Sequence, residues 1–182
     1  MLSLKSRKLS EREGEREMKM YRWCPDGIDP MRVPSRNTPR QYGRGLYFAP
    51  NRASADHWLG ELEHAASQRG EDIAYILHEI DVEDENLMEI NVEDFLMYFC
   101  EYMRERTGES PKFGDMWDEY DYWMKHPVMD AIGVEATECG VCPIYSISGY
   151  IVRMYVFAKG FQGMSVKCPE GFENLNEVVL FR

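Results

Sequence analysis

The most informative stretch of the sequence is Tyr42-Gly43-Arg44-Gly45-Leu46-Tyr47-Phe48-Ala49-Pro50-Asn51-Arg52-Ala53-Ser54-Ala55. Two glycines one residue apart allow a sharp turn and a close approach of the backbone to a ligand. A short aromatic strand follows, and then a polar turn that can start a helix at Ser54. The order of turn, strand and helix start predicts a ligand that lies across the end of the strand.

Strands and helices alternate around this stretch in a pattern typical of the α+β class. Alternating or β-branched runs predict strands at residues 18–24, 46–49, 73–82, 86–90, 131–134, 144–147, 150–157, 164–167 and 177–181. Apolar spacing of three and four, with Ser and Gly at the ends, predicts helices at residues 54–68, 92–106 and 116–125. Residues 25–41 contain four prolines and are expected to form a long loop.

The length and composition indicate a single folded unit. The chain has 182 residues, of which 44% are hydrophobic and 13% aromatic, enough for one core and too few for two ordinary domains. We expect residues 1–17 to be a charged tail or a loosely docked helix, and residues 18–182 to be one domain. No apolar run is long enough for a membrane span, and five scattered cysteines suit reduced thiols, so we expect a cytoplasmic protein, in its own or a host cell.

The charge is divided unevenly along the chain. Residues 1–60 hold 12 Lys and Arg against 7 Asp and Glu, whereas residues 61–182 hold 9 against 25. The acidic part disfavours general binding of nucleic acid, because it repels the phosphate backbone. The basic part suits one small polyanion, and its arginines near the glycine turn are Arg22, Arg32, Arg36, Arg40, Arg44 and Arg52.

Three further features carry chemistry or binding. Glu177 precedes an apolar strand, and a carboxylate on such a rigid mount can orient a sugar hydroxyl or stabilise a developing oxocarbenium ion. Cys139 and Cys142 have a spacing found in zinc sites, but a turn between two strands is the favoured interpretation. The aromatic helix at residues 116–123 suits core packing, with a protein-recognition face as the alternative.

Taken together, three segments resemble an ADP-ribosyltransferase domain in order and spacing. Tyr21-Arg22 lies on the first strand, Tyr42-Gly-Arg-Gly-Leu-Tyr-Phe-Ala with Ser54-Ala55 follows, and Asn176-Glu177-Val-Val-Leu-Phe ends the chain. The central segment is similar to that of the poly(ADP-ribose) polymerase type. The resemblance covers residues 18–90 and 128–182, and it implies a split β-sheet with a helical insertion at 91–127, as in small bacterial and phage members.

The resemblance also implies roles for individual residues. Glu177 would be the catalytic glutamate that contacts the ribose 2′-hydroxyl of NAD, and the loop at residues 25–41 would cover NAD. Arg22 and Tyr47 would complete the catalytic set, with Tyr47 stacking on the nicotinamide ring. The NAD-binding set would comprise Tyr21, Arg22, Trp23, Gly43, Gly45, Tyr47, Phe48, Ser54 and His57, with Ser54 bonded to the carboxamide and no metal ion involved.

The sequence departs from the polymerase-type pattern at one motif and from the toxin-like pattern at another. Arg22-Trp23 replaces the polymerase-type His-Gly, which favours transfer of a single ADP-ribose, and Leu175 stands where the toxin-like branch has Gln or Glu. We therefore expect a mono-ADP-ribosyltransferase, of toxin or effector type, that modifies a partner protein. The main alternative is an inactive binding or inhibitor protein that acts through its acidic surface, and a third is an RNA-directed enzyme of related fold.

Overall fold

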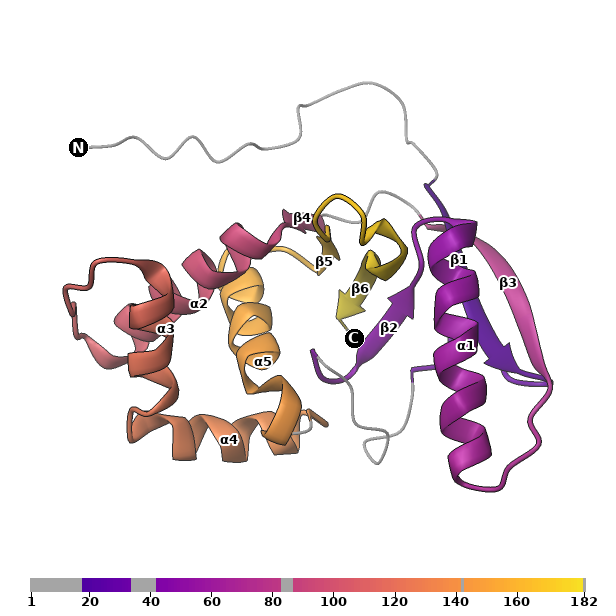
Figure 1. Cartoon of the computed structure of the whole chain (residues 1–182), viewed down its shortest axis with the longest axis horizontal. Helices are drawn as coiled ribbons and strands as arrows, with labels where there is room; N and C mark the ends of the chain where they lie inside the picture. Colours follow the sequence, from indigo (N-terminus) through magenta and orange to yellow (C-terminus); the bar gives the residue numbers. More distant parts are fainter. Residues whose placement is uncertain (1–17, 34–41, 83–86, 142, 182) are drawn as a thin grey trace.

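A computed structural model describes residues 18–33, 42–82, 87–141 and 143–181. The predicted tail at 1–17, Arg36, Arg40 and Cys142 lie outside these ranges. The described chain is mixed α+β, with two separate sheets, as predicted. Figure 1 shows a two-stranded sheet with one helix at one end of the molecule, a second sheet in the middle, and a group of helices at the other end.

The first sheet pairs β1 (Met18–Pro25) with β3 (Tyr75–Val82) in antiparallel register, from Met18 opposite Val82 to Pro25 opposite Tyr75. Helix α1 (Arg52–Gln68) packs beside it, and the Trp23 indole N–H donates to the Ala55 carbonyl at 2.9 Å. Asn51 caps α1 by accepting from the Ser54 N–H at 2.9 Å, so the predicted cap at Ser54 is wrong. Asn51 has the extended backbone of an N-cap residue, whereas Ser54 is already inside the helix.

The second sheet has the order β2–β6–β5–β4, and apolar clusters cover both faces of β6. Its strands are β2 (Gly45–Phe48), β4 (Leu87–Ile90), β5 (Gly163–Val166) and β6 (Glu177–Phe181). One face contributes to a core cluster with Met20 of β1, and the other packs against the helices. Since both faces are covered, β6 is apolar at every position after Glu177.

The helices at the far end form the larger core. They are α2 (Val92–Thr107), α3 (Met116–Met124), α4 (Val128–Glu138) and α5 (Pro143–Ala158). Asn91 and Asp94 form a capping box at the start of α2, and Gly108 ends it with a left-handed backbone. Glu119 of α3 is 4% exposed and accepts hydrogen bonds from the Arg104 guanidinium of α2 and from the Trp123 indole.

The predicted strands at 131–134, 144–147 and 150–157 are wrong, because α4 and α5 occupy these residues. Helix α5 packs against α2, α4 and β5, and Tyr150, Ile151 and Val152 are all buried. A helix that is buried on most sides shows no clear helical period, so its β-branched residues suggested strands. The helical region therefore extends to Ala158, well beyond the predicted 91–127, and Cys139 ends a helix rather than a strand.

The strands at both ends of the chain and the first helices agree with prediction. The strands expected at 18–24, 46–49, 164–167 and 177–181 and the helices expected at 54–68, 92–106 and 116–125 are confirmed within a few residues. Over the described ranges, none of the helices combines the length and the apolar character that crossing a membrane requires.

Candidate functional site

The three segments that carry the predicted site residues lie on neighbouring strands. Tyr21 of β1 forms two backbone hydrogen bonds with Ala49, at 2.9 and 2.8 Å. β2 pairs with β6 in antiparallel register, with Phe48 opposite Val178. One further step of this register puts Ala49 level with Glu177, so the end of β2, the first strand and the last strand meet in one row.

The side chains of this row divide between the two faces of the second sheet. Phe48 lies in the cluster with Met20 and Val178, whereas Tyr47 packs with Val179 against the helices. Because successive side chains of a strand alternate, Glu177 lies on the same face as Val179 and therefore as Tyr47. The predicted catalytic glutamate and stacking tyrosine thus share the face of the sheet that the helices cover.

Glu177 lies within electrostatic reach of a tyrosine and a cysteine. Burial and the negative charge of Glu177 raise the pKa of the Tyr42 phenol, which is 3% exposed. The same two causes, in the same order, raise the pKa of the half-buried Cys168 thiol. The backbone N–H of Cys168 donates to the Asn176 side chain at 2.7 Å, which ties the segment after β5 to the residue before Glu177. Glu177 itself is half-buried.

Tyr47 is held by the glycine turn that precedes it. Its hydroxyl donates to the Gly43 carbonyl at 2.7 Å and accepts from the Tyr42 N–H at 3.0 Å. Its ring is nearly parallel to that of Tyr42, with 6.5 Å between centroids and 19° between planes. Tyr42 is therefore a neighbour of both Tyr47 and Glu177, although the resemblance implies no role for it. Its position directly before the Gly43 turn was the available signal.

Both glycines approach the protein's own chain. Gly43 has φ +80°, and a Cβ there would lie 2.8 Å from a methyl of Val141. A Cβ on Gly45 would lie 2.6 Å from the Leu180 carbonyl oxygen of β6. Packing alone thus requires glycine at both positions.

The turn is also fastened to the helical region. Arg44 donates its backbone N–H to the Cys139 carbonyl at 3.0 Å. Arg153 of α5, 7% exposed, donates one Nη to the carbonyls of Tyr42 and Arg44, at 2.9 and 2.5 Å.

Arg22 lies on the opposite face of β2 from Tyr47. Its guanidinium donates to the carbonyls of Pro30 and Arg32 and lies 5.9 Å from the centroid of the Phe48 ring. The structure therefore brings Arg22 together with Phe48 and the start of the proline-rich loop, whose residues 34–41 lie outside the described ranges. It does not place Arg22 on the face that Tyr47 and Glu177 share.

The side chains on and beside α1 that are predicted to contact NAD already contact other residues of the protein. Ser54 is fully buried, and its hydroxyl donates to the Glu173 carbonyl at 3.1 Å, in the 3-10 turn η1 (Glu173–Leu175) just before Glu177. The Trp23 ring carries the Arg52 guanidinium 5.7 Å from its centroid. His57 is half-buried and meets the Trp58 ring edge-on, with centroids 5.2 Å apart.

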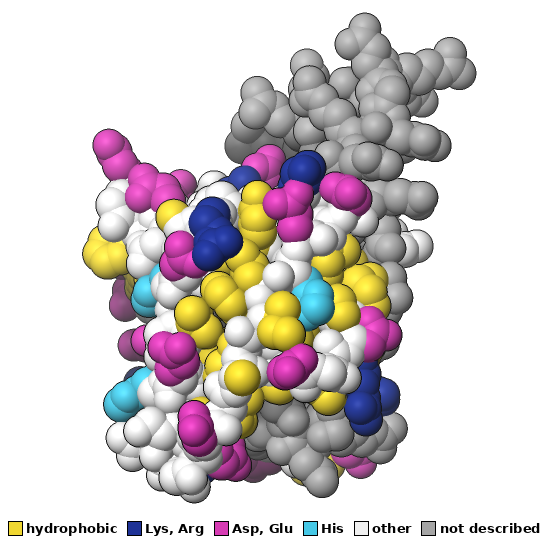
Figure 2. All heavy atoms as spheres, turned by 90° about the vertical axis from the view of Figure 1, so that its right-hand side faces the viewer, with side chains coloured by type: hydrophobic (Ala, Val, Ile, Leu, Met, Phe, Trp, Pro, Cys, Tyr) yellow, Lys and Arg dark blue, Asp and Glu magenta, His cyan; other side chains and the backbone are white. Residues whose placement is uncertain are grey.

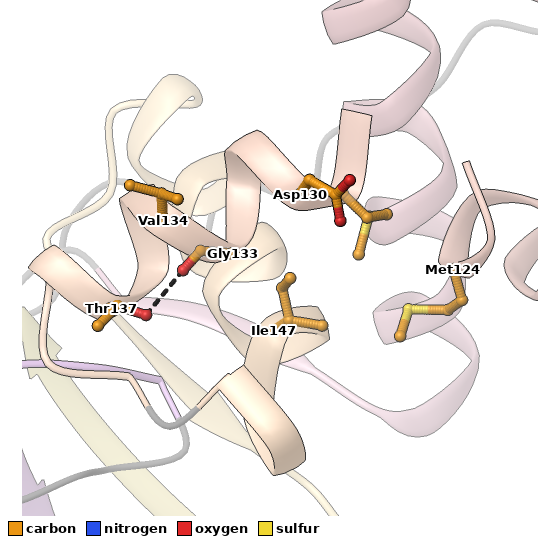
Figure 3. Close-up of a pocket in the computed structure, with 7 residues that line it drawn as sticks. Met124, Asp130, Gly133, Val134, Thr137 and Ile147 are labelled. Carbon is orange, nitrogen blue, oxygen red and sulfur yellow. Dashed lines mark hydrogen bonds between the residues drawn. The ribbon is translucent and has the colours of Figure 1, made fainter. Parts of the chain in front are cut away.

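Two hollows in the described surface lie away from these residues. One, of about 450 Å³, lies among α3, α4 and α5 and has Asp130 at its edge; Figure 3 shows the Thr137 hydroxyl bonded to the Gly133 carbonyl beside it. The other, of about 490 Å³, lies at the end of α1. Neither is lined by a predicted site residue. Among the described residues, no group of three or more His, Cys, Asp and Glu side chains could hold a metal ion.

No protein family and no curated protein matches the chain. Among solved structures, it is similar to the M. tuberculosis MbcT–MbcA toxin–antitoxin complex, with 18% identity and a TM-score of 0.42. The match covers 91% of this chain and 74% of the other. A similarity at this level carries neither a fold nor a function over to this protein.

Proposed function

We propose that this protein is a mono-ADP-ribosyltransferase that transfers ADP-ribose from NAD to a side chain of a partner protein and releases nicotinamide. The observation that supports it is the row formed by Tyr21, Ala49 and Glu177. The three segments that resemble the transferase motifs are far apart in the sequence, yet they lie on adjacent strands.

In this proposal Glu177 is the catalytic group. Its carboxylate orients the ribose 2′-hydroxyl and stabilises the positive charge that develops at the anomeric carbon as the bond to nicotinamide breaks. The bonding electrons leave with nicotinamide, a lone pair of the acceptor side chain forms the new bond, and the acceptor's proton passes to solvent or to a nearby base. The start of β6 is a rigid mount for this role.

Tyr47 and the residues around it form the proposed wall for the nicotinamide ring. Tyr47 offers its ring, and in this proposal Tyr21, Trp23 and His57 also contact NAD, while Phe48 contributes from the opposite face of β2. The Ser54 hydroxyl donates to the Glu173 carbonyl but can still accept from the carboxamide N–H; because Ser54 is fully buried, such a contact requires η1 to move aside. The exposed Arg32, Arg44 and Arg52, with Arg22, offer positive charge for the diphosphate.

The test combines NAD binding with transfer. Wild-type protein is incubated with labelled NAD and cell lysate, and labelled proteins and free nicotinamide are measured. We expect Glu177→Gln to lower the rate by about 100-fold or more while NAD still binds in calorimetry, since it removes an electrostatic contact to the transition state. Glu89→Gln, an exposed change on β4, is the matched control. Absence of NAD binding together with equal, background transfer by all three proteins would refute the proposal.

The second candidate is a binding protein without turnover. It is favoured by the full burial of Ser54 and by its bond to Glu173, which close the predicted carboxamide contact in this structure. Under this alternative, a partner binds through the acidic surface, salt weakens the complex, and neither NAD nor Glu177→Gln changes its affinity.

A further inference from the structure

We propose that the outer edge of β3 accepts an extended segment of a partner protein, in which apolar and polar residues alternate and the ends are basic. The segment extends the two-stranded sheet and places a lysine or arginine in the hollow at the end of α1. This site is separate from the row around Glu177.

The edge of β3 is long and regular. Within the part of the chain that the structure describes, β3 pairs with β1 alone, through a ladder that runs without a bulge from Tyr75 to Val82. In such a strand every second residue directs its N–H and C=O away from the existing partner, so the outer edge presents a row of backbone donors and acceptors.

Several of the usual protections of an edge strand are missing from β3, although Glu79 and Asp81 carry charge. It contains no lysine, arginine or proline and no bulge, all of which discourage pairing with another chain. Ile76 is 43% exposed on one face of the sheet, and half-buried Ile80 lies on the same face four residues further along. Figure 2 looks onto this end of the molecule and shows hydrophobic side chains gathered in the middle, with charged ones around them.

Charge indicates which segment fits. On the other face of β3, Glu79 and Asp81 are exposed and acidic, and Glu79 is paired with Lys19 of β1. Next to the start of the strand lies the hollow of about 490 Å³, whose lining includes Glu63, Glu71, Asp72 and Tyr75. Tyr75 belongs both to the hollow and to β3, so the two features are continuous.

The hollow favours a positive charge. Glu71 is paired with Arg69, but Glu63 and Asp72 form no ion pair with another described residue. It also contains Ala66 and Ser67 from the last turn of α1, where the helix dipole is negative. Backbone pairing would supply affinity along the edge, and the acidic hollow would select a basic side chain.

The experiment uses the full chain and three fluorescent ten-residue peptides of alternating valine and threonine. The first carries lysine at both ends, the second carries glutamate there, and the third repeats the first with alternate backbone nitrogens methylated. Fluorescence anisotropy without NAD measures affinity, so the result is independent of catalysis. We expect the lysine peptide to bind at least 10-fold more tightly than either of the others.

Variants locate the binding. Ile76→Lys places a positive charge on the open edge and is expected to lower the affinity for the lysine peptide at least 10-fold. The pair Glu63→Gln and Asp72→Asn should remove the preference for lysine over glutamate, whereas Asp130→Asn, on the other hollow, should change nothing. The methylated peptide needs no change in the protein, so the test survives a variant that fails to fold.

Three results would overturn the proposal. One is equal affinity for the lysine and glutamate peptides, or no binding of either. Another is equal affinity for the methylated peptide, which would indicate attraction of charge without strand pairing. The last is a dimer in sedimentation velocity that Ile76→Lys abolishes, which would assign the edge to a second copy of this chain.

Discussion

The side chain of Arg153 fastens the glycine turn at residues 43–45 to helix α5. Replacing it with methionine keeps much of the apolar stem but removes the donor shared by the Tyr42 and Arg44 carbonyls. It also removes a guanidinium that lies 4.6 Å from the Phe181 ring centroid and 5.3 Å from that of Phe157. We expect Arg153→Met to destabilise the protein and loosen the turn that holds Tyr47.

The size of the effect follows from opposing contributions. A hydrogen bond from a charged donor is worth about 1.5–3 kcal/mol, and a contact of a cation with an aromatic face about 0.5–2 kcal/mol. Against these stands the cost of burying the guanidinium, which pairs with no carboxylate among the described residues and whose pKa burial lowers. With the desolvation cost offsetting roughly half of the gain, a net loss of about 3 kcal/mol is expected.

Urea unfolding and thermal melting measure this loss. A change of about 3 kcal/mol lowers the Tm of a protein of this size by about 6–12 °C. Arg69→Met is the matched control, because Arg69 is exposed and solvent screens its ion pair with Glu71. If Arg153→Met is as stable as wild type, the desolvation cost cancels the bonds and the reasoning fails. Faster hydrogen exchange at the Arg44 amide would locate the effect in the turn.

Three further predictions concern single sites. Gly43→Ala should lower the free energy of unfolding, measured in urea, by about 1–3 kcal/mol, because φ at Gly43 is +80° and an added Cβ has no room. Gly60→Ala, in open space on α1, should instead raise the free energy of unfolding by about 0.5–1 kcal/mol. Equal effects of the two changes would contradict this prediction. Burial raises the pKa of Glu119, but its bonds to arginine and tryptophan outweigh burial, so the net pKa is lowered. Because the pKa of Glu119 is lower in the folded state, its carboxylate stabilises the protein above the unfolded pKa, and this stabilisation is lost as pH falls through the folded pKa. Glu119→Gln should therefore make the free energy of unfolding depend less steeply on pH on the acid side. An unchanged slope would count against this prediction. Burial and the charge of Glu177 raise the pKa of Cys168, so Glu177→Gln should speed alkylation of Cys168 at pH 8, as measured by peptide mass spectrometry. An unchanged alkylation rate would show that the charge of Glu177 does not act on Cys168.

Local signals were sufficient for much of the fold. The alternating residues of β1, the Asn91 capping box and Gly108 each act within a few positions, so α2 and the terminal strands were predictable from the sequence. Helix α5 was not, because burial on several sides removed the polar face that reveals a helix. The candidate site follows the same division. Glu177 and Tyr47 could be proposed from their segments, while the proximity of Tyr42 and Cys168 to Glu177 could not.

By itself, the sequence determined the α+β class and the strand segments at both ends. These depend on local backbone preferences and on the alternation of side chains. Only the tertiary structure decided that Tyr21, Ala49 and Glu177 form one row, and that Arg22 faces away from Tyr47. The reason is that strand order, register and the face that each side chain occupies depend on pairing between residues far apart in the sequence, and no local pattern encodes such pairing.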